Sequence, residues 1–180
     1  MLSDIEFDND GSLILGVTDR VAHQYGVRNY GVGTGLPNRN IASSGDILRL
    51  CYSYATGTYV AEGSAGCAQN SGNGDSPTLG DQDEYYDGDF FCRTNGNLVC
   101  HYETSFGGLL QVPGEEDVVL SGMDPSGINS GGLYWLSNDT GQKSHIFELY
   151  DSGSYPTNGS TNETFSKASG LGDIAAACQA

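Results

Sequence analysis

Short apolar runs divided by turn-forming residues extend through the whole chain, and this pattern constrains the fold more than any other feature. The runs are rich in Val, Ile, Tyr, Thr and Phe, and clusters of Gly, Asn, Asp and Ser separate them. Runs of this length and composition are typical of β-strands. Apolar residues at a helical spacing are rare, and the one fair helical segment is the short tail LGDIAAACQA at 171–180.

We expect about ten short strands joined by tight turns, which favours an all-β sandwich or barrel. The expected strands lie near residues 12–17, 20–25, 46–54, 57–62, 85–93, 97–104, 108–112, 117–121, 132–137 and 144–150. Two long segments rich in Gly, Ser and Asp, 63–84 and 151–170, contain little to bury and are expected to be loops.

The length of 180 residues fits a single β-rich domain, 1–180. A chain of this length can form a hydrophobic core that is stable without disulfides or metal ions. Two small lobes, at about 1–84 and 85–180, are the alternative organisation. Segments 41–57 and 128–141 share a weak sequence similarity. Either an internal duplication or two ordinary hairpins of similar composition would explain it.

The balance of charge excludes several classes of partner. Asp and Glu number 23 against 7 Lys and Arg, so the formal net charge is −16. Such a surface repels nucleic acids and anionic membranes. The longest apolar runs, such as LILGV, are too short to cross a membrane, and the acidic start MLSDIEFDNDGS lacks the pattern of a cleavable signal. We therefore expect no nucleic-acid partner, no membrane insertion and no cleavable signal peptide.

The stretch FFCRTNGNLVCHY at 90–102 is expected to form a hairpin, and its turn decides how two cysteines meet. A two-residue turn at Asn95-Gly96 places Cys92 opposite Val99, with Cys100 on the other face. A three-residue loop places Cys92 opposite Cys100 and also pairs Phe90 with Tyr102 and Phe91 with His101. Facing aromatic side chains stabilise this second register.

The chain has five cysteines and no CxxC pair, so a zinc-ribbon site is not expected. A disulfide between Cys92 and Cys100 follows from the second register, and Cys51 and Cys67 are a further candidate pair. The odd count leaves at least one thiol free. The alternative is that the cysteines are buried thiols that pack as small apolar residues.

Two acidic clusters are candidate calcium sites, because calcium binds several oxygen ligands on a turning backbone. The segment DNDG resembles half of a calcium loop, although the EF-hand pattern is incomplete. Solvated acidic loops are the alternative interpretation. The candidate ligands are Asp4, Glu6, Asp8 and Asp10 in the first cluster and Asp81, Asp83, Asp87 and Asp89 in the second.

No catalytic motif is visible, and we expect no enzyme. The histidines His23, His101 and His145 are scattered and show no metal-binding spacing. Candidate glycosylation sequons begin at Asn138, Asn158 and Asn162. The eleven tyrosines and Trp135 suit protein interfaces and strand surfaces better than a sugar-binding face.

The segments SSGDILRL…ATGTYVAEGS and SGGLYWLSNDTG resemble parts of small decoration and tail-associated proteins of bacteriophages and archaeal viruses. The resemblance covers roughly a third of the chain, and the five cysteines depart from it. It implies a structural protein of a virion or extracellular assembly that packs against copies of itself, a shell or filament proteins. The alternative is a secreted or surface binding module, such as a pilin-like, adhesin or calcium-dependent lectin-like domain.

Overall fold

The computed structural model describes residues 1–21, 27–29, 39–40, 45–67, 84–128, 130–150 and 171–177. They form an all-β fold, as expected from the short apolar runs. Within these ranges no helix is long and apolar enough to cross a membrane. The strands are β1 (Leu2–Phe7), β2 (Leu13–Thr18), β3 (Val27–Asn29), β4 (Arg39–Asn40), β5 (Gly45–Ser53), β6 (Thr58–Ala61), β7 (Phe91–Asn95), β8 (Asn97–His101), β9 (Ser105–Gln111), β10 (Asp117–Met123), β11 (Gly131–Ser137) and β12 (Lys143–Tyr150).

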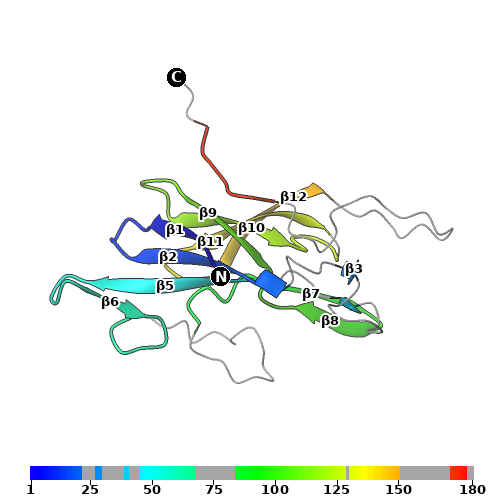
Figure 1. The fold of residues 1–180 in the computed structure, drawn as a ribbon, viewed down its shortest axis with the longest axis horizontal. Coiled ribbons are helices and arrows are strands. Elements are labelled where there is room, and N and C mark those ends of the chain that lie inside the picture. The colour runs from blue at the N-terminus through cyan, green and yellow to red at the C-terminus, as the bar shows by residue number, and fades with distance from the viewer. Residues whose placement is uncertain are drawn as a thin grey trace.

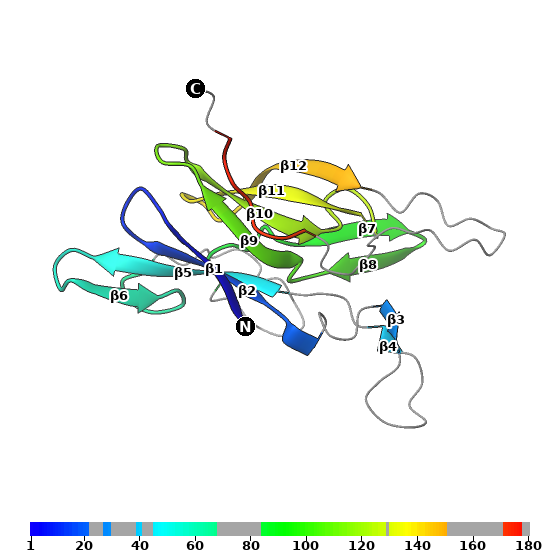
Figure 2. The ribbon, with the colours of Figure 1, turned by 45° about the horizontal axis from the view of Figure 1, so that its top comes forward.

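Two four-stranded antiparallel sheets form the body of the molecule (Figures 1 and 2). The first sheet has the order β1-β2-β5-β6, and the second has the order β12-β11-β10-β9. The first is built from the N-terminal part of the chain and the second from the C-terminal part. Two smaller ladders, β3-β4 and β7-β8, are separate from these sheets.

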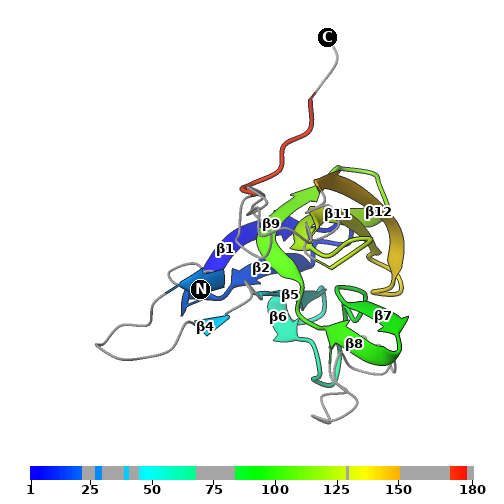
Figure 3. The same cartoon turned by 90° about the vertical axis from the view of Figure 1, so that its right-hand side faces the viewer.

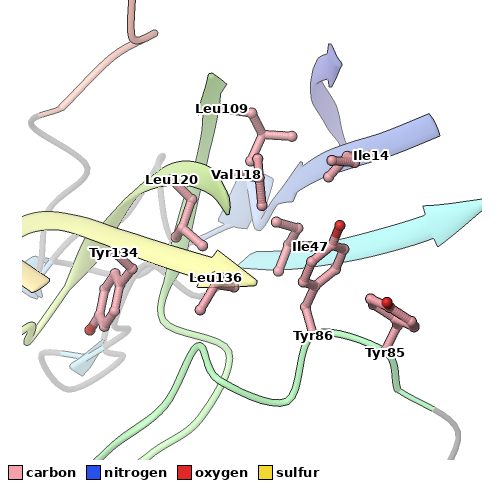
Figure 4. Packing of buried hydrophobic residues seen from close by; sticks show 9 residues of the cluster. All are labelled: Ile14, Ile47, Tyr85, Tyr86, Leu109, Val118, Leu120, Tyr134 and Leu136. Atoms are coloured by element: carbon pink, nitrogen blue, oxygen red, sulfur yellow. The ribbon is translucent and has the colours of Figure 1, made fainter. Parts of the chain in front are cut away.

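The described residues form an apolar core between the two sheets (Figure 4). Ile14 of β2 and Ile47 of β5 face it from the first sheet, and the segment before β7 adds Tyr85 and Tyr86. The second sheet contributes Leu109, Val118, Leu120, Tyr134 and Leu136. Because both sheets bury side chains in this one cluster, the described parts of the two halves of the chain pack as a sandwich.

Glycines let the two sheets approach backbone to backbone at β9. A Cβ atom on Gly16 would lie 2.3 Å from the carbonyl oxygen of Gly107, so no side chain fits there. Gly107 itself has a φ of 83°, which disfavours other residues. Strand β9 therefore packs directly on β2 and positions the second sheet relative to the first.

The β7-β8 hairpin has the register that a three-residue loop predicts. Cys92 lies opposite Cys100, Phe91 lies opposite His101, and the rings of Phe90 and Tyr102 stack with centroids 6.5 Å apart. The alternative register, in which a two-residue turn places Cys92 opposite Val99, is wrong. Gly96 at the turn has a φ of 80°, a conformation that glycine adopts at no steric cost.

Both candidate cysteine pairs are disulfides in this structure, Cys51 with Cys67 and Cys92 with Cys100. The fifth cysteine, Cys178, lies outside the described residues. Disulfides persist in oxidising surroundings and are rare in reducing ones. The two bonds therefore indicate an extracellular or otherwise oxidising environment.

Three expectations about local structure are corrected. Residues 2–7, where no strand was expected, form strand β1. The strand expected at 85–93 begins only at Phe91. The tail is not helical over 171–177, and it begins beside Gly108 of β9 before leading away from the sheets (Figure 3). The strand expected at 20–25 and both long loops lie mostly outside the described residues.

Candidate functional site: a cleft where three turns meet

A cleft of about 430 Å³ opens at one end of the sandwich. Three turns meet there: 8–12 between β1 and β2, 112–116 between β9 and β10, and 138–142 between β11 and β12. Loops at the ends of a rigid sandwich commonly carry binding sites. The lining residues are Asp8, Asn9, Asp10, Ser12, Arg49, Cys51, Tyr52, Gly66, Tyr85, Glu116, Asn138 and Asp139.

Hydrogen bonds between the turns fix the shape of the cleft. The Asn9 amide Nδ2 donates to the carbonyl oxygen of Glu115 at 2.7 Å, and the Gly114 amide donates to Asn9 Oδ1 at 2.9 Å. The Asn138 amide donates to the Glu116 carbonyl at 2.9 Å. The Cys51–Cys67 disulfide ties a fourth segment to the rim. The lining is therefore held in place by contacts between distant parts of the chain.

Arg49 lies buried at the base of this cleft, with its side chain 5% exposed. Its Nη2 donates to Asp8 Oδ2 at 2.6 Å and to Asp10 Oδ2 at 2.9 Å, and its Nη1 donates to the Tyr86 hydroxyl at 3.1 Å. The guanidinium also lies 4.8 Å from the ring centroid of Tyr85. Burial would lower the pKa of Arg49, but the neighbouring phenols and carboxylates more than offset it, so the guanidinium is a permanent cation.

Asn138 belongs to the same buried network and cannot carry a glycan in this fold, which corrects the expectation from its sequon. The residue is 6% exposed. Its Nδ2 donates to Asp8 Oδ1 at 3.0 Å and to Gln111 Oε1 at 2.8 Å, and its Oδ1 accepts from the Tyr86 hydroxyl at 2.7 Å. An N-linked sugar on Nδ2 would disrupt these bonds. The other two sequons, at Asn158 and Asn162, lie outside the described residues.

The first acidic cluster does not form a single open loop. Asp4 lies on β1 and accepts a hydrogen bond from the Leu109 amide of the second sheet at 2.7 Å. Glu6 also lies on β1, and burial followed by the nearby charge of Asp4 raises its pKa. The carboxylates of Asp8 and Asp10 converge on the guanidinium of Arg49 instead.

The second cluster is divided between a turn and the core. Asp87 accepts a hydrogen bond from the Gln142 side chain, and Asp89 is fully buried beside Thr104. Asp81 and Asp83 lie outside the described residues. A different trio, Asp46, Glu84 and Glu103, brings carboxylate oxygens within 4.8 Å of one another. The three side chains are partly buried, and calcium binding stays a prediction from the sequence.

Glu62, next to this trio, links the rim of the cleft to the core. Its Oε2 accepts hydrogen bonds from the amides of Arg49 at 3.0 Å and Tyr85 at 3.2 Å. Burial, joined by the charge of Asp46, raises the pKa of Glu62 to about 7, although the two amides and the Arg49 charge oppose the shift. The folded chain therefore favours the protonated form of this carboxyl group.

This raised pKa predicts that acidification stabilises the protein. The folded state binds a proton at Glu62 that the unfolded chain releases above its ordinary pKa, so stability falls as pH rises toward 7 and is recovered as pH drops to 5. We expect the wild type to gain about 2 kcal/mol between pH 8 and pH 5 relative to the Glu62→Gln variant. Urea unfolding across this range measures the difference, with Glu115→Gln as the exposed control. Parallel pH profiles for wild type and Glu62→Gln would refute the assignment.

The histidines have separate partners. His101 pairs with the buried carboxylate of Asp124, and the His145 ring packs edge-on against Trp135 with centroids 5.2 Å apart. His23 lies outside the described residues. The two described histidines therefore contribute to different local contacts and do not line the cleft.

The first sheet is apolar on its outer side as well as in the core. In the strand register, Phe7 lies beside Leu13 and Ile5 lies beside Leu15. On the far side of β2, Leu13 lies beside Leu50 and Leu15 lies beside Leu48. Phe7 and Ile5 are 62% and 48% exposed, and the leucines are half-buried. We refer to these residues together with Val17 as the outer face: Ile5, Phe7, Leu13, Leu15, Val17, Leu48 and Leu50.

Sequence reasoning missed Arg49, the centre of the cleft network. The available signal was its position in DILRLCYS, where one cation interrupts an apolar strand. A buried cation needs buried anions, but the pattern does not say which ones. The acids that pair with it are 39 and 41 residues away in the chain.

Comparisons with known proteins reveal one distant relative. A stretch of Colossin-A from Dictyostelium discoideum is 28% identical to this chain over 184 residues, which cover 99% of the chain and 2% of Colossin-A. The chain thus spans about one fiftieth of the length of that relative. No family model matches the chain, and no solved structure matches it.

Proposed function

We propose that this protein is a non-catalytic structural module of an oxidising, extracellular setting that packs against copies of itself through the outer face. The observation that carries the proposal is that the first sheet has apolar residues on both sides. The inner side is buried by the second sheet, whereas Ile5 and Phe7 on the outer side remain about half exposed. An extensive apolar patch on a protein surface commonly marks an interaction site.

A second copy of the sheet suits this surface. The seven side chains of the outer face carry no charge, and Asp46, opposite Val17 on β5, is the acidic residue that borders them in the strand register. They form a regular grid across β1, β2 and β5. Sheets cover such faces by packing against another sheet with interdigitating side chains, and a two-fold axis would bring the same patch together on both subunits.

The net charge of −16 opposes this association at low ionic strength. Screening by salt or by divalent cations such as calcium reduces the repulsion while leaving the apolar contact intact. We therefore propose that assembly strengthens with ionic strength. A virion decoration, tail or filament subunit that contacts other shell proteins is the more specific form of this role that the sequence resemblance suggests.

Sedimentation velocity of purified protein in a sodium chloride and calcium series tests the proposal. We expect the wild type to associate more strongly as salt increases, and the double variant Ile5→Asn with Phe7→Asn to associate at least about tenfold more weakly, since burial of each apolar side chain contributes more than 1 kcal/mol. The matched control is Phe147→Asn with Leu149→Asn on β12, where the two side chains are 53% and 50% exposed. A wild type that stays monomeric in every buffer, or two variants that behave alike, would contradict the proposal.

A secreted or surface binding module is the second candidate function. The two disulfides favour it, because small secreted domains use such bonds. The similarity to a short stretch of a far longer protein also suits a module that works beside other domains. In this case the partner would bind the cleft as well as, or instead of, the outer face.

A further inference from the structure

The cleft has an excess of negative charge that its own residues do not balance. Its described lining holds four carboxylates, Asp8, Asp10, Glu116 and Asp139, and one guanidinium, Arg49. That guanidinium is buried and already bonded to Asp8 and Asp10. The side chain of Asp10 is nevertheless 57% exposed, and Glu116 and Asp139 are exposed at the mouth. A ligand entering the cleft therefore meets an excess of negative charge, because the guanidinium of Arg49 is already paired with Asp8 and Asp10.

Asp10 stays ionised in the folded protein at neutral pH, because its pKa is lowered. Burial tends to raise the pKa of Asp10, but hydrogen bonds from Ser12 and the interaction with Arg49 lower it overall. The carboxyl groups of Glu116 and Asp139 face solvent. Anionic ligands are repelled from such a cleft, and cations are attracted into it.

Aromatic rings in the wall restrict the kind of cation. Tyr52 and Tyr85 both line the cleft, and the ring of Tyr52 packs against Tyr54 and Tyr59 with centroids 4.8 and 5.2 Å apart. Tyrosine rings attract ammonium and guanidinium groups at their faces. Tyr85 already does so within this protein, because Arg49 lies 4.8 Å from its centroid.

The shape of the cleft favours an organic cation over a metal ion. Calcium needs six to eight oxygens at a single point, and the two carboxylates that converge, those of Asp8 and Asp10, converge on Arg49. The remaining carboxylates come from separate turns, 112–116 and 138–142. A volume of about 430 Å³ also falls in the range of pockets for small organic ligands.

The geometry points to a binding site for a guanidinium or alkylammonium group in the cleft between the turns 8–12, 112–116 and 138–142. The group is held by Asp10, Glu116 and Asp139 and packs against Tyr52. A basic side chain of a partner protein and a free polyamine share this chemistry. The inference goes beyond the association proposed above and does not rest on it, since the cleft lies at the end of the sandwich and not on the outer face.

Titration calorimetry with arginine amide, spermidine and a short arginine-containing peptide tests the site in the full chain. We expect saturable binding at about 20 mM sodium chloride that weakens several-fold at about 300 mM, because salt screens exposed charges. The double variant Glu116→Gln with Asp139→Asn should bind about tenfold more weakly, in line with two partly exposed ion pairs. Tighter binding of the peptide than of spermidine identifies a partner's side chain as the source, and the reverse identifies a free amine.

The control is Glu148→Gln, which removes an exposed carboxylate on β12 outside the cleft lining and should leave binding unchanged. Amide chemical shifts in an NMR titration should move in 8–12, 112–116 and 138–142. Absence of binding at low salt, binding that is equal in wild type and double variant, or shifts confined to other regions would overturn the inference. Calcium binding at these turns without amine binding would overturn it too. A monomeric protein that still binds arginine amide would refute the proposed association and leave this site intact.

Discussion

Replacement of Arg49 by Met is expected to lower the free energy of unfolding by about 3–5 kcal/mol. The guanidinium is the partner of Asp8, whose side chain is only 7% exposed, and it also reaches Asp10 and Tyr86. Methionine keeps much of the apolar stem but leaves the Asp8 carboxylate buried beside Asn138 with no cation. An uncompensated buried charge is among the costliest single changes in a protein.

Urea unfolding at pH 7 measures this loss, and Arg20→Met, at an exposed position, is the control. The combined variant Asp8→Asn with Arg49→Met should recover part of the stability, because it removes the stranded charge together with its partner. A cost below about 1 kcal/mol, the range of an exposed ion pair, would show that Arg49 does not hold the cleft turns together.

Removal of the Cys51–Cys67 disulfide should be the second largest effect, at about 3 kcal/mol for a separation of 16 residues. The bond anchors the loop that carries Glu62, and Cys67 is itself 5% exposed, so alanine there loses packing as well as the cross-link. The variant Cys51→Ala with Cys67→Ala is compared with Cys92→Ala and Cys100→Ala in the exposed hairpin.

The hairpin disulfide closes a loop of only 8 residues and is expected to contribute about 2 kcal/mol. Thermal and urea unfolding of both alanine pairs measure the two losses. A greater loss in the hairpin variant than in the Cys51–Cys67 variant would contradict the assigned importance of the cleft rim.

Local signals predicted much of this fold. The all-β class followed from short apolar runs, and the register of the β7-β8 hairpin followed from facing aromatic residues around Asn95-Gly96. These features depend on residues close in sequence, because the turn residues and the cross-strand pairs next to them determine the stability of a hairpin. Strand β1 was missed because Asp4 and Glu6 were interpreted as part of an acidic calcium loop, although they alternate with Ile5 and Phe7 as in a strand.

The cleft could not be predicted from local signals. Its three turns come together only once the two sheets are stacked, and the bond from Asn138 to Asp8 joins residues 130 positions apart. The sequon at Asn138 suggested a glycosylation site for the same reason, because a three-residue motif does not show whether the asparagine is buried. The expected tail helix is absent over 171–177, since so short a segment has little to offset the cost of helix nucleation.

Hydrogen–deuterium exchange at low and high protein concentration, in about 0.5 M sodium chloride to screen charge, tests the central claim most directly. The claim is that the outer face of the first sheet is a contact surface between copies of the protein. We predict that higher concentration slows exchange in peptides covering β1, β2 and β5, residues 2–7, 13–18 and 45–53, and leaves β12 at 143–150 unchanged. Exchange that is independent of concentration in the first sheet, or protection confined to β12, would contradict the account.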